Sequence, residues 1–102
     1  MARSRLDLQT ELETILGSEN VYYQPPENVK MRFPAIVYDR DRSWDIWADD
    51  KKYLLYKGYL VTVVGLDPDS SVLDQVELLP MCTYVRHFNA DGLNHDVFLI
   101  YY

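Results

Sequence analysis

The sequence has a single cysteine, few glycines and no long apolar run. One thiol, Cys82, cannot form an internal disulfide, which fits a reducing cytoplasm or indifference to redox state. No apolar run approaches the roughly 20 residues that a membrane-spanning helix requires. The N-terminus is basic without a following apolar segment, so we expect no secretory signal and no membrane association.

Basic residues are also scarce, with 10 Lys and Arg against 16 Asp and Glu, for a formal net charge of −6. This balance argues against wrapping nucleic acid, which needs a basic surface to displace counterions. It still allows a surface past which DNA slides. With 102 residues, 48% of them hydrophobic and 25% charged, the chain has the composition of one globular domain spanning 1–102.

Two helices are expected. In the first, the apolar residues Leu8, Leu12, Ile15 and Leu16 share one face, with a cap at Ser4 and an end at Gly17. Its other positions are expected to face solvent: Asp7, Gln9, Glu11 and Glu13. The second helix follows the turn 67–71 and closes before Pro80, and we expect Asp67 and Asp69 to cap it.

Strands are expected at 21–24, 35–38, 53–66, 82–89 and 95–102. The polar segment 39–52 alternates and predicts a further strand or a hairpin arm, with its turn at Asp49 and Asp50. Within 53–66, Gly58 predicts a bulge, and apolar residues of both parities predict that both faces are covered. The residues 90–94 predict a loop between the last two strands.

This order predicts an α+β fold, with a mostly antiparallel sheet of about five to six strands and two helices packed on one face.

The sequence argues against metal chemistry and against cysteine chemistry. The side chains that could hold a metal lack the Cys-x-x-Cys or His-x-x-x-His spacing of zinc sites: Cys82, His87, Asp91, His95 and Asp96. We expect His87 and His95 to hydrogen-bond around the loop instead. Cys82 is expected to be half-buried core filler rather than a nucleophile. No phosphate loop, dinucleotide fingerprint or nucleophile elbow occurs, so no cofactor is predicted.

Surplus aromatic residues point to contacts between chains. Trp44 and Trp47 lie among charges, where they either form an interface or fold back on the chain's own core. The candidate interface residues are Trp44, Trp47, Arg40, Arg42, Asp49 and Asp50. The tyrosines of the strands suggest surface or intersubunit positions in the same way: Tyr53, Tyr56, Tyr59, Tyr101 and Tyr102.

Most of the chain resembles one family in three stretches, 5–38, 53–70 and 82–102. Its most specific pieces are NVYYQPPE at 20–27, DPDS at 67–70, and RHF at 86–88 with NHD at 94–96. The pattern resembles small neck proteins of long-tailed bacteriophages, of the tail terminator, tail completion or minor capsid type. The segment 39–52 carries the resemblance least.

The resemblance implies a structural virion protein without catalytic residues, assembled in the host bacterial cytoplasm. A tail terminator forms a ring, usually a hexamer, that caps the tail tube and meets the connector on the head side, while DNA passes through unbound. An acidic channel would let DNA slide. The alternatives are a head-completion, stopper or other neck adaptor, a monomeric adaptor that binds through an edge strand, and a small metal- or cysteine-dependent enzyme using Cys82, His87 and His95.

Overall fold

The computed structural model describes residues 4–25, 30–48, 51–67 and 69–102, with the backbone alone described at 42–48 and 51–56. Its elements are, in chain order, α1 (Arg5–Leu16), β1 (Val21–Tyr23), β2 (Ala35–Ala48), β3 (Lys51–Gly65), α2 (Ser71–Glu77), β4 (Cys82–Ala90) and β5 (Leu93–Tyr101).

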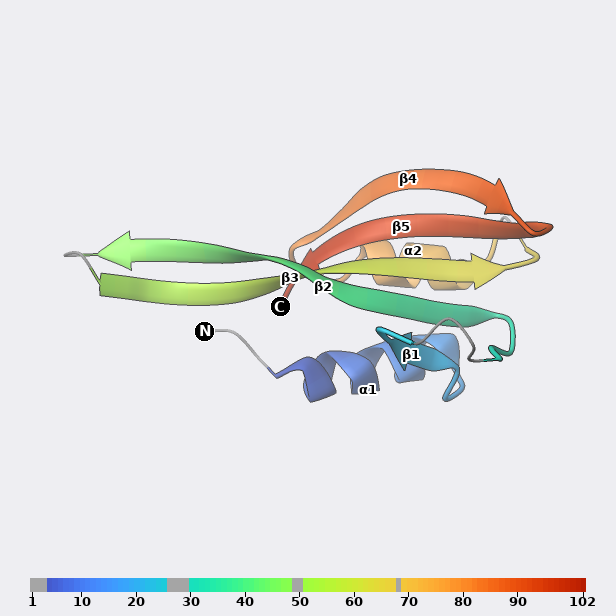
Figure 1. The fold of residues 1–102 in the computed structure, drawn as a ribbon, viewed down its shortest axis with the longest axis horizontal. Helices are drawn as coiled ribbons and strands as arrows, with labels where there is room; N and C mark the ends of the chain where they lie inside the picture. Colours follow the sequence, from blue (N-terminus) through green and yellow to red (C-terminus); the bar gives the residue numbers. More distant parts are fainter. Residues whose placement is uncertain (1–3, 26–29, 49–50, 68) are drawn as a thin grey trace.

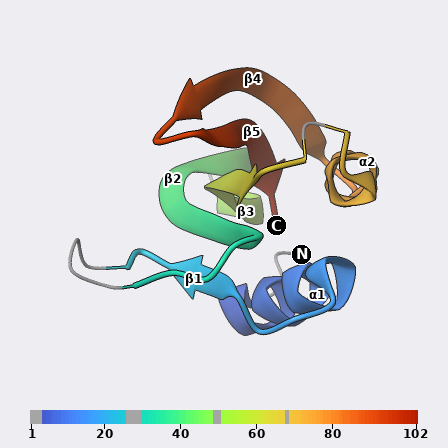
Figure 2. The same ribbon diagram turned by 90° about the vertical axis from the view of Figure 1, so that its right-hand side faces the viewer.

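The five strands form one sheet in the order β1-β2-β3-β5-β4 (Figure 1). Strand β1 runs parallel to β2, and every other neighbouring pair is antiparallel. Both helices lie on the same side of this sheet (Figure 2). The predicted α+β fold, with a mostly antiparallel sheet and two helices, is therefore confirmed.

Helix α1 begins and ends where its capping residues predict. The Ser4 hydroxyl accepts a hydrogen bond from the Asp7 backbone N–H at 3.3 Å. Gly17 has a φ of 78° and donates its backbone N–H to the Glu13 carbonyl, which closes the last turn. Leu8 and Leu12 are fully buried against the sheet. The prediction that Gln9 and Glu11 face solvent is wrong: the Gln9 side chain donates to the Val21 carbonyl at 3.0 Å and so ties α1 to β1, and one side-chain oxygen of Glu11 is buried.

Helix α2 begins at Ser70 rather than at an acidic cap. The Ser70 hydroxyl accepts from the Val72 N–H, while the Asp67 carboxylate accepts from the Asp69 N–H at 2.9 Å one turn earlier. The prediction that Asp67 and Asp69 cap the helix is thus wrong, since they shape the turn that precedes the cap. The helix ends at Glu77, and its buried contact with the core is Val76.

The β4–β5 hairpin turns more tightly than expected. Asp91 and Gly92 both have positive φ, 53° and 75°, and they connect Ala90 directly to Leu93. Two residues with positive φ form the mirror-image turn that matches the twist of paired strands. The predicted loop 90–94 is therefore a two-residue turn.

The core lies between the helices and one face of the sheet. Its largest fully buried side chains are Tyr38, Tyr59, Phe98, Leu8, Leu12, Ile36 and Ile100. On β2, β3 and β5 these residues occupy alternate positions in register, for example Tyr38 beside Val61 and Val61 beside Phe98. In the described part of the chain, neither helix has the length and apolar character needed to cross a bilayer.

Candidate functional site

A two-stranded arm extends from the sheet (Figure 1). We use the name "the arm" for residues 42–48 of β2 and 51–57 of β3. Strand β5 accompanies β3 as far as the pair Gly58–Tyr101, and Tyr102 still bonds Lys57. Beyond Lys57, β2 and β3 pair with each other alone within the described chain. The molecule measures 50 × 27 × 23 Å, and the arm lies along the longest dimension. The hairpin arm predicted for the polar segment 39–52 is therefore present, as part of β2 and β3.

A bulge marks the base of the arm. Arg40 pairs with Tyr59 and Arg42 with Gly58, so Asp41 is the extra residue. The bulge predicted at Gly58 is present at that level, although the additional residue belongs to β2. A bulge bends and twists its strand, which lets the arm leave the plane of the sheet.

The C-terminus holds the base of the arm from the other side. The Tyr102 N–H donates to the Lys57 carbonyl at 2.9 Å, and the Lys57 N–H donates to the Tyr102 carbonyl at 3.3 Å. The Tyr102 residue itself is buried in the core cluster. The base of the arm is therefore fixed to the body of the domain.

Most of the predicted interface residues fall on or beside the arm. Arg40 is exposed in β2 just before the bulge. Positions 42, 44 and 47 lie in the β2 half of the arm, whereas Asp49 and Asp50 lie outside the described residues. In the ladder, Trp44 pairs with Tyr56 and Ile46 with Leu54. The arm therefore gathers aromatic and large aliphatic residues at neighbouring register positions.

Two strand tyrosines belong to the core instead of the surface. Tyr59 is 1% exposed and Tyr102 is 4% exposed, so the expectation of surface or intersubunit positions is wrong for both. Tyr59 forms edge contacts with Tyr38 and Tyr23, at centroid separations of 6.0 and 6.4 Å. Their rings fill the space beneath the base of the arm.

Helix α1 supplies polar partners for this tyrosine cluster. The Arg5 guanidinium lies 4.3 Å from the Tyr23 ring centre and donates to the Tyr38 hydroxyl at 3.1 Å. That hydroxyl in turn donates to the Gln9 side-chain oxygen. Burial raises the pKa of Tyr38, and the nearby Arg5 charge opposes the rise. The Tyr38 hydroxyl therefore stays protonated at neutral pH and keeps its hydrogen bonds beneath the base of the arm.

The sheet face opposite the helices forms a second apolar surface. We use the name "the open face" for Val37, Leu60, Thr62, Val64, Val97 and Leu99, which alternate with the core residues and sit beside one another in register. Among the described residues, no helix or strand covers this side (Figure 2). Val64 and Val97 are buried there, and the other four are half-buried. The prediction that both faces of strand β3 are covered is confirmed for the face that packs against the helices. On the open face it is confirmed only in part, because Val64 is buried while Leu60 and Thr62 are half-buried.

A hollow of about 330 Å³ lies at one end of the open face. Its lining includes Met31, Phe33, Phe88, Leu93 and His95, together with residues of the open face. Phe33 is 44% exposed although it is a large apolar residue. The Phe88 and His95 rings stack at a centroid distance of 4.7 Å and form one wall. The hollow can accept an apolar side chain from another molecule.

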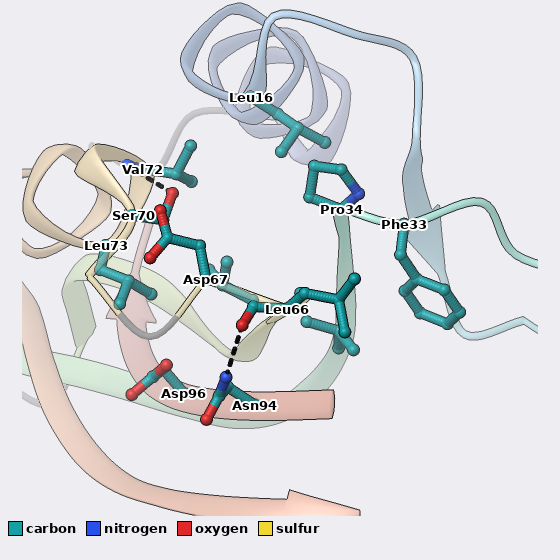
Figure 3. Close-up of a pocket in the computed structure, with 13 residues that line it drawn as sticks. Leu16, Phe33, Pro34, Leu66, Asp67, Ser70, Val72, Leu73, Asn94 and Asp96 are labelled. Atoms are coloured by element: carbon teal, nitrogen blue, oxygen red, sulfur yellow. Dashed lines mark hydrogen bonds between the residues drawn. The ribbon is translucent and has the colours of Figure 1, made fainter. Parts of the chain in front are cut away.

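A second cavity, of about 310 Å³, opens between the C-terminal end of α1 and the start of α2 (Figure 3). Leu16, Val72 and Leu73 line its helix side, and Asp67 and Asp96 are its carboxylates. The buried Asp96 accepts a hydrogen bond from the Tyr84 hydroxyl at 2.9 Å.

The remaining polar groups of this cavity are used by the fold. The Asn94 side chain donates to the Leu66 carbonyl at 3.1 Å, and Asp67 is engaged in the turn before α2. The Asn94–Leu66 bond joins the approach to α2 to the β4–β5 hairpin, whereas the Tyr84–Asp96 bond connects the two strands of the hairpin itself. The cavity is therefore a gap at the end of the core whose polar groups hold the elements around it.

The candidate residues for metal or cysteine chemistry are distributed along both faces and both ends of the β4–β5 hairpin. Cys82 begins β4 opposite Ile100, whereas His87 lies near the turn opposite Asp96. Because His95 pairs with Phe88, it falls on the open face, while His87 and Asp96 fall on the helix side. Among the described residues, no group of three or more His, Cys, Asp or Glu side chains could hold a metal ion.

Hydrogen bonds or burial account for the positions of His87, His95 and Cys82. The His87 imidazole hydrogen-bonds the Asn94 side-chain oxygen at 3.1 Å, and the His95 imidazole hydrogen-bonds the Leu93 carbonyl at 3.2 Å. The predicted hydrogen bonds around the loop are therefore present. Cys82 is half-buried, as expected, and burial followed by the Glu77 charge raises its pKa to about 11. A thiol with this pKa stays protonated at neutral pH and is a poor nucleophile.

The sequence predicted the arm but missed the open face. The alternation of Leu60 and Thr62 with buried Val61 and Val63 was the available signal, but it equally fits a strand covered on both sides. Comparison with known proteins adds no relative: no protein-family model matches the chain, and no curated protein matches it.

Proposed function

We propose that the protein is a structural component of the head–tail neck of a long-tailed bacteriophage, and that it acts as a tail terminator. In this role about six copies form a ring that caps the tail tube and joins it to the connector on the head side. The protein has no catalytic role and needs no cofactor. It assembles in the host cytoplasm and remains in the virion.

The observation that supports an assembly role best is the arm. A two-stranded hairpin is marginally stable in water by itself, and the arm has no third strand beside it in the described chain. Its ladder carries Trp44, Ile46, Leu54 and Tyr56 at paired positions. Such residues gain free energy when another molecule covers them.

The charge of the chain fits passage of DNA through a ring. Each copy carries a net charge of −6, so an acidic channel would repel phosphate rather than bind it. The Cys82 environment argues against the alternative of a cysteine-dependent enzyme, because its pKa is raised to about 11. The specific choice of a terminator rests on the family resemblance of the sequence.

Electron microscopy of phage particles made without this protein tests the role. A tail terminator predicts complete heads and complete tails that remain unjoined, with tails of abnormal length. Tails of normal length beside heads that leak DNA would instead indicate a head-completion or stopper protein. Particles of normal appearance and infectivity would contradict every neck role.

A further inference from the structure

The arm and the open face lie along the same pair of strands, β2 and β3, with Asp39 and Arg42 between their apolar positions. On β3, alternate residues from Leu60 to Val64 lie on the open face, and the same alternation continues through Gly58 to positions 56 and 54. Their partners in β2 are Trp44 and Ile46. By register, positions 44, 46, 54 and 56 therefore continue the side of the sheet that carries the open face, and Asp39 and Arg42 separate the two groups.

The arm part and the sheet part of β3 have similar lengths. Residues 51–57 of β3 belong to the arm and 58–65 to the sheet. At about 3.3 Å per residue, each part is roughly 25 Å long. An arm from one copy is therefore long enough to cross the open face of another copy and reach its hollow.

The distribution of charge favours the arm, rather than the body, as the part that contacts a second copy. Residues 42–57 contain four basic and three acidic residues, while the rest of the chain contains six basic and thirteen acidic residues. Two bodies packed face to face would bring strongly like-charged surfaces together. An arm that is slightly positive meets a strongly negative body without that repulsion.

We propose that the arm of one copy packs across the open face of a second copy, so that copies associate head to tail. The apolar positions 44, 46, 54 and 56 then cover Leu60, Thr62 and Leu99 and fill the hollow beside Phe33. Each copy has one arm and one open face, so every copy is both donor and acceptor. Such a heterologous contact builds a closed ring when the rotation between copies permits it. The closure of these contacts into a ring rests on the proposed function. The contact between arm and open face does not depend on it.

Mixing two defective variants tests the contact. The arm variant Trp44→Ser/Ile46→Ser keeps its open face. The face variant Leu60→Lys/Leu99→Glu keeps its arm, and its cross-strand ion pair preserves the pairing of β3 with β5. Leu78→Ser removes an 83% exposed apolar residue at the end of α2 and is the matched control.

Sedimentation velocity at millimolar protein concentration gives the readout, with circular dichroism as the check of folding. We expect the wild-type chain and Leu78→Ser to form oligomers, and each double variant alone to associate at least about tenfold more weakly. An equimolar mixture of the double variants should form a dimer, because one intact arm meets one intact open face. A dimer formed by the arm variant alone, no dimer in the mixture, or a monomeric wild-type chain would overturn the proposal.

Disulfide trapping covers the case in which a double variant does not fold. Ile46→Cys and Thr62→Cys are combined in a Cys82→Ser background and oxidised with oxidised glutathione. Head-to-tail contact predicts a ladder of covalent oligomers, and the pair Leu78→Cys with Thr62→Cys should give none beyond dimers. Absence of the ladder would overturn the contact, whereas normal particles lacking the protein would overturn the phage role, so the two failures are distinguishable.

Discussion

Strand β3 passes through two regions that have opposite surroundings. From Gly58 to Gly65 it lies between β2 and β5, with helices packed over Tyr59, Val61 and Val63. From Lys51 to Tyr56 it pairs with β2 alone among the described residues. Both halves are rich in apolar residues, yet one half forms the core and the other extends from it. Apolar content alone therefore does not decide burial, because the neighbouring strands and helices determine which residues find partners.

The largest expected effect of a single change lies in the body half. Phe98 is fully buried beside Val61, and its ring contacts Tyr84 at a centroid distance of 5.3 Å. Phe98→Ala should lower the free energy of unfolding by about 3–5 kcal/mol, because it removes buried surface and leaves a cavity. Urea denaturation measures this loss. The exposed residue Leu78 is the control, and Leu78→Ala should change stability by less than about 0.5 kcal/mol. Equal losses in the two variants would contradict the placement of the core.

The arm half should show the reverse pattern. Replacing Trp44 and Trp47 with Ser should block assembly and leave the monomer folded, since the core cluster of the described residues forms between the helices and the body of the sheet. The expected loss of unfolding free energy is below about 1 kcal/mol, the size of a cross-strand pair. Sedimentation measures assembly and thermal melting measures folding. Loss of the cooperative melting transition would show that the tryptophans belong to the chain's own core.

Alkaline pH should weaken the body. The folded-state pKa of Cys82 is raised to about 11, and burial also raises the pKa of Tyr38 and Tyr59. A raised pKa contributes stability that is fully present below the unfolded-state value and is lost as pH rises through the folded-state value. Unfolding free energy should therefore fall as pH rises from about 9 to about 11. The fall should be shallower in Cys82→Ser, as measured by urea denaturation at several pH values. An unchanged slope would contradict burial of this thiol.

Salt should have the smallest effect, acting on repulsion between bodies. Each copy carries a net charge of −6, and salt at 0.1 M screens charges over about 10 Å. Raising the salt concentration should therefore strengthen self-association, which sedimentation at several salt concentrations measures. Oligomers that dissociate as salt rises would show that ion pairs hold them together, through residues such as Arg40 or Lys51.

Local signals in the sequence predicted most of the fold. Ser4 and Gly17 defined α1, and Asp91 with Gly92 marked the hairpin turn, because caps and turns depend on a few neighbouring residues. Contacts between distant residues were missed. Gln9 turned inward because Tyr38 and Val21 lie beside it, and Tyr59 was buried because β1 and α1 cover it.

The candidate site was predicted in part for the same reason. Alternation in 39–52 indicated a paired arm, since the period of two is local. The open face was not predicted, because the topology of the whole sheet decides which side of Leu60 and Leu99 the two described helices leave uncovered.

Hydrogen–deuterium exchange of the arm tests most directly whether the arm finds its partner in another copy. At low protein concentration, the amides of 42–48 and 51–56 should exchange much faster than those of 58–65. At concentrations where oligomers form, the arm amides should become protected while those of β5 change little. Arm amides that are as protected as the body at every concentration would show that the arm is stable without a second copy, and would contradict this account.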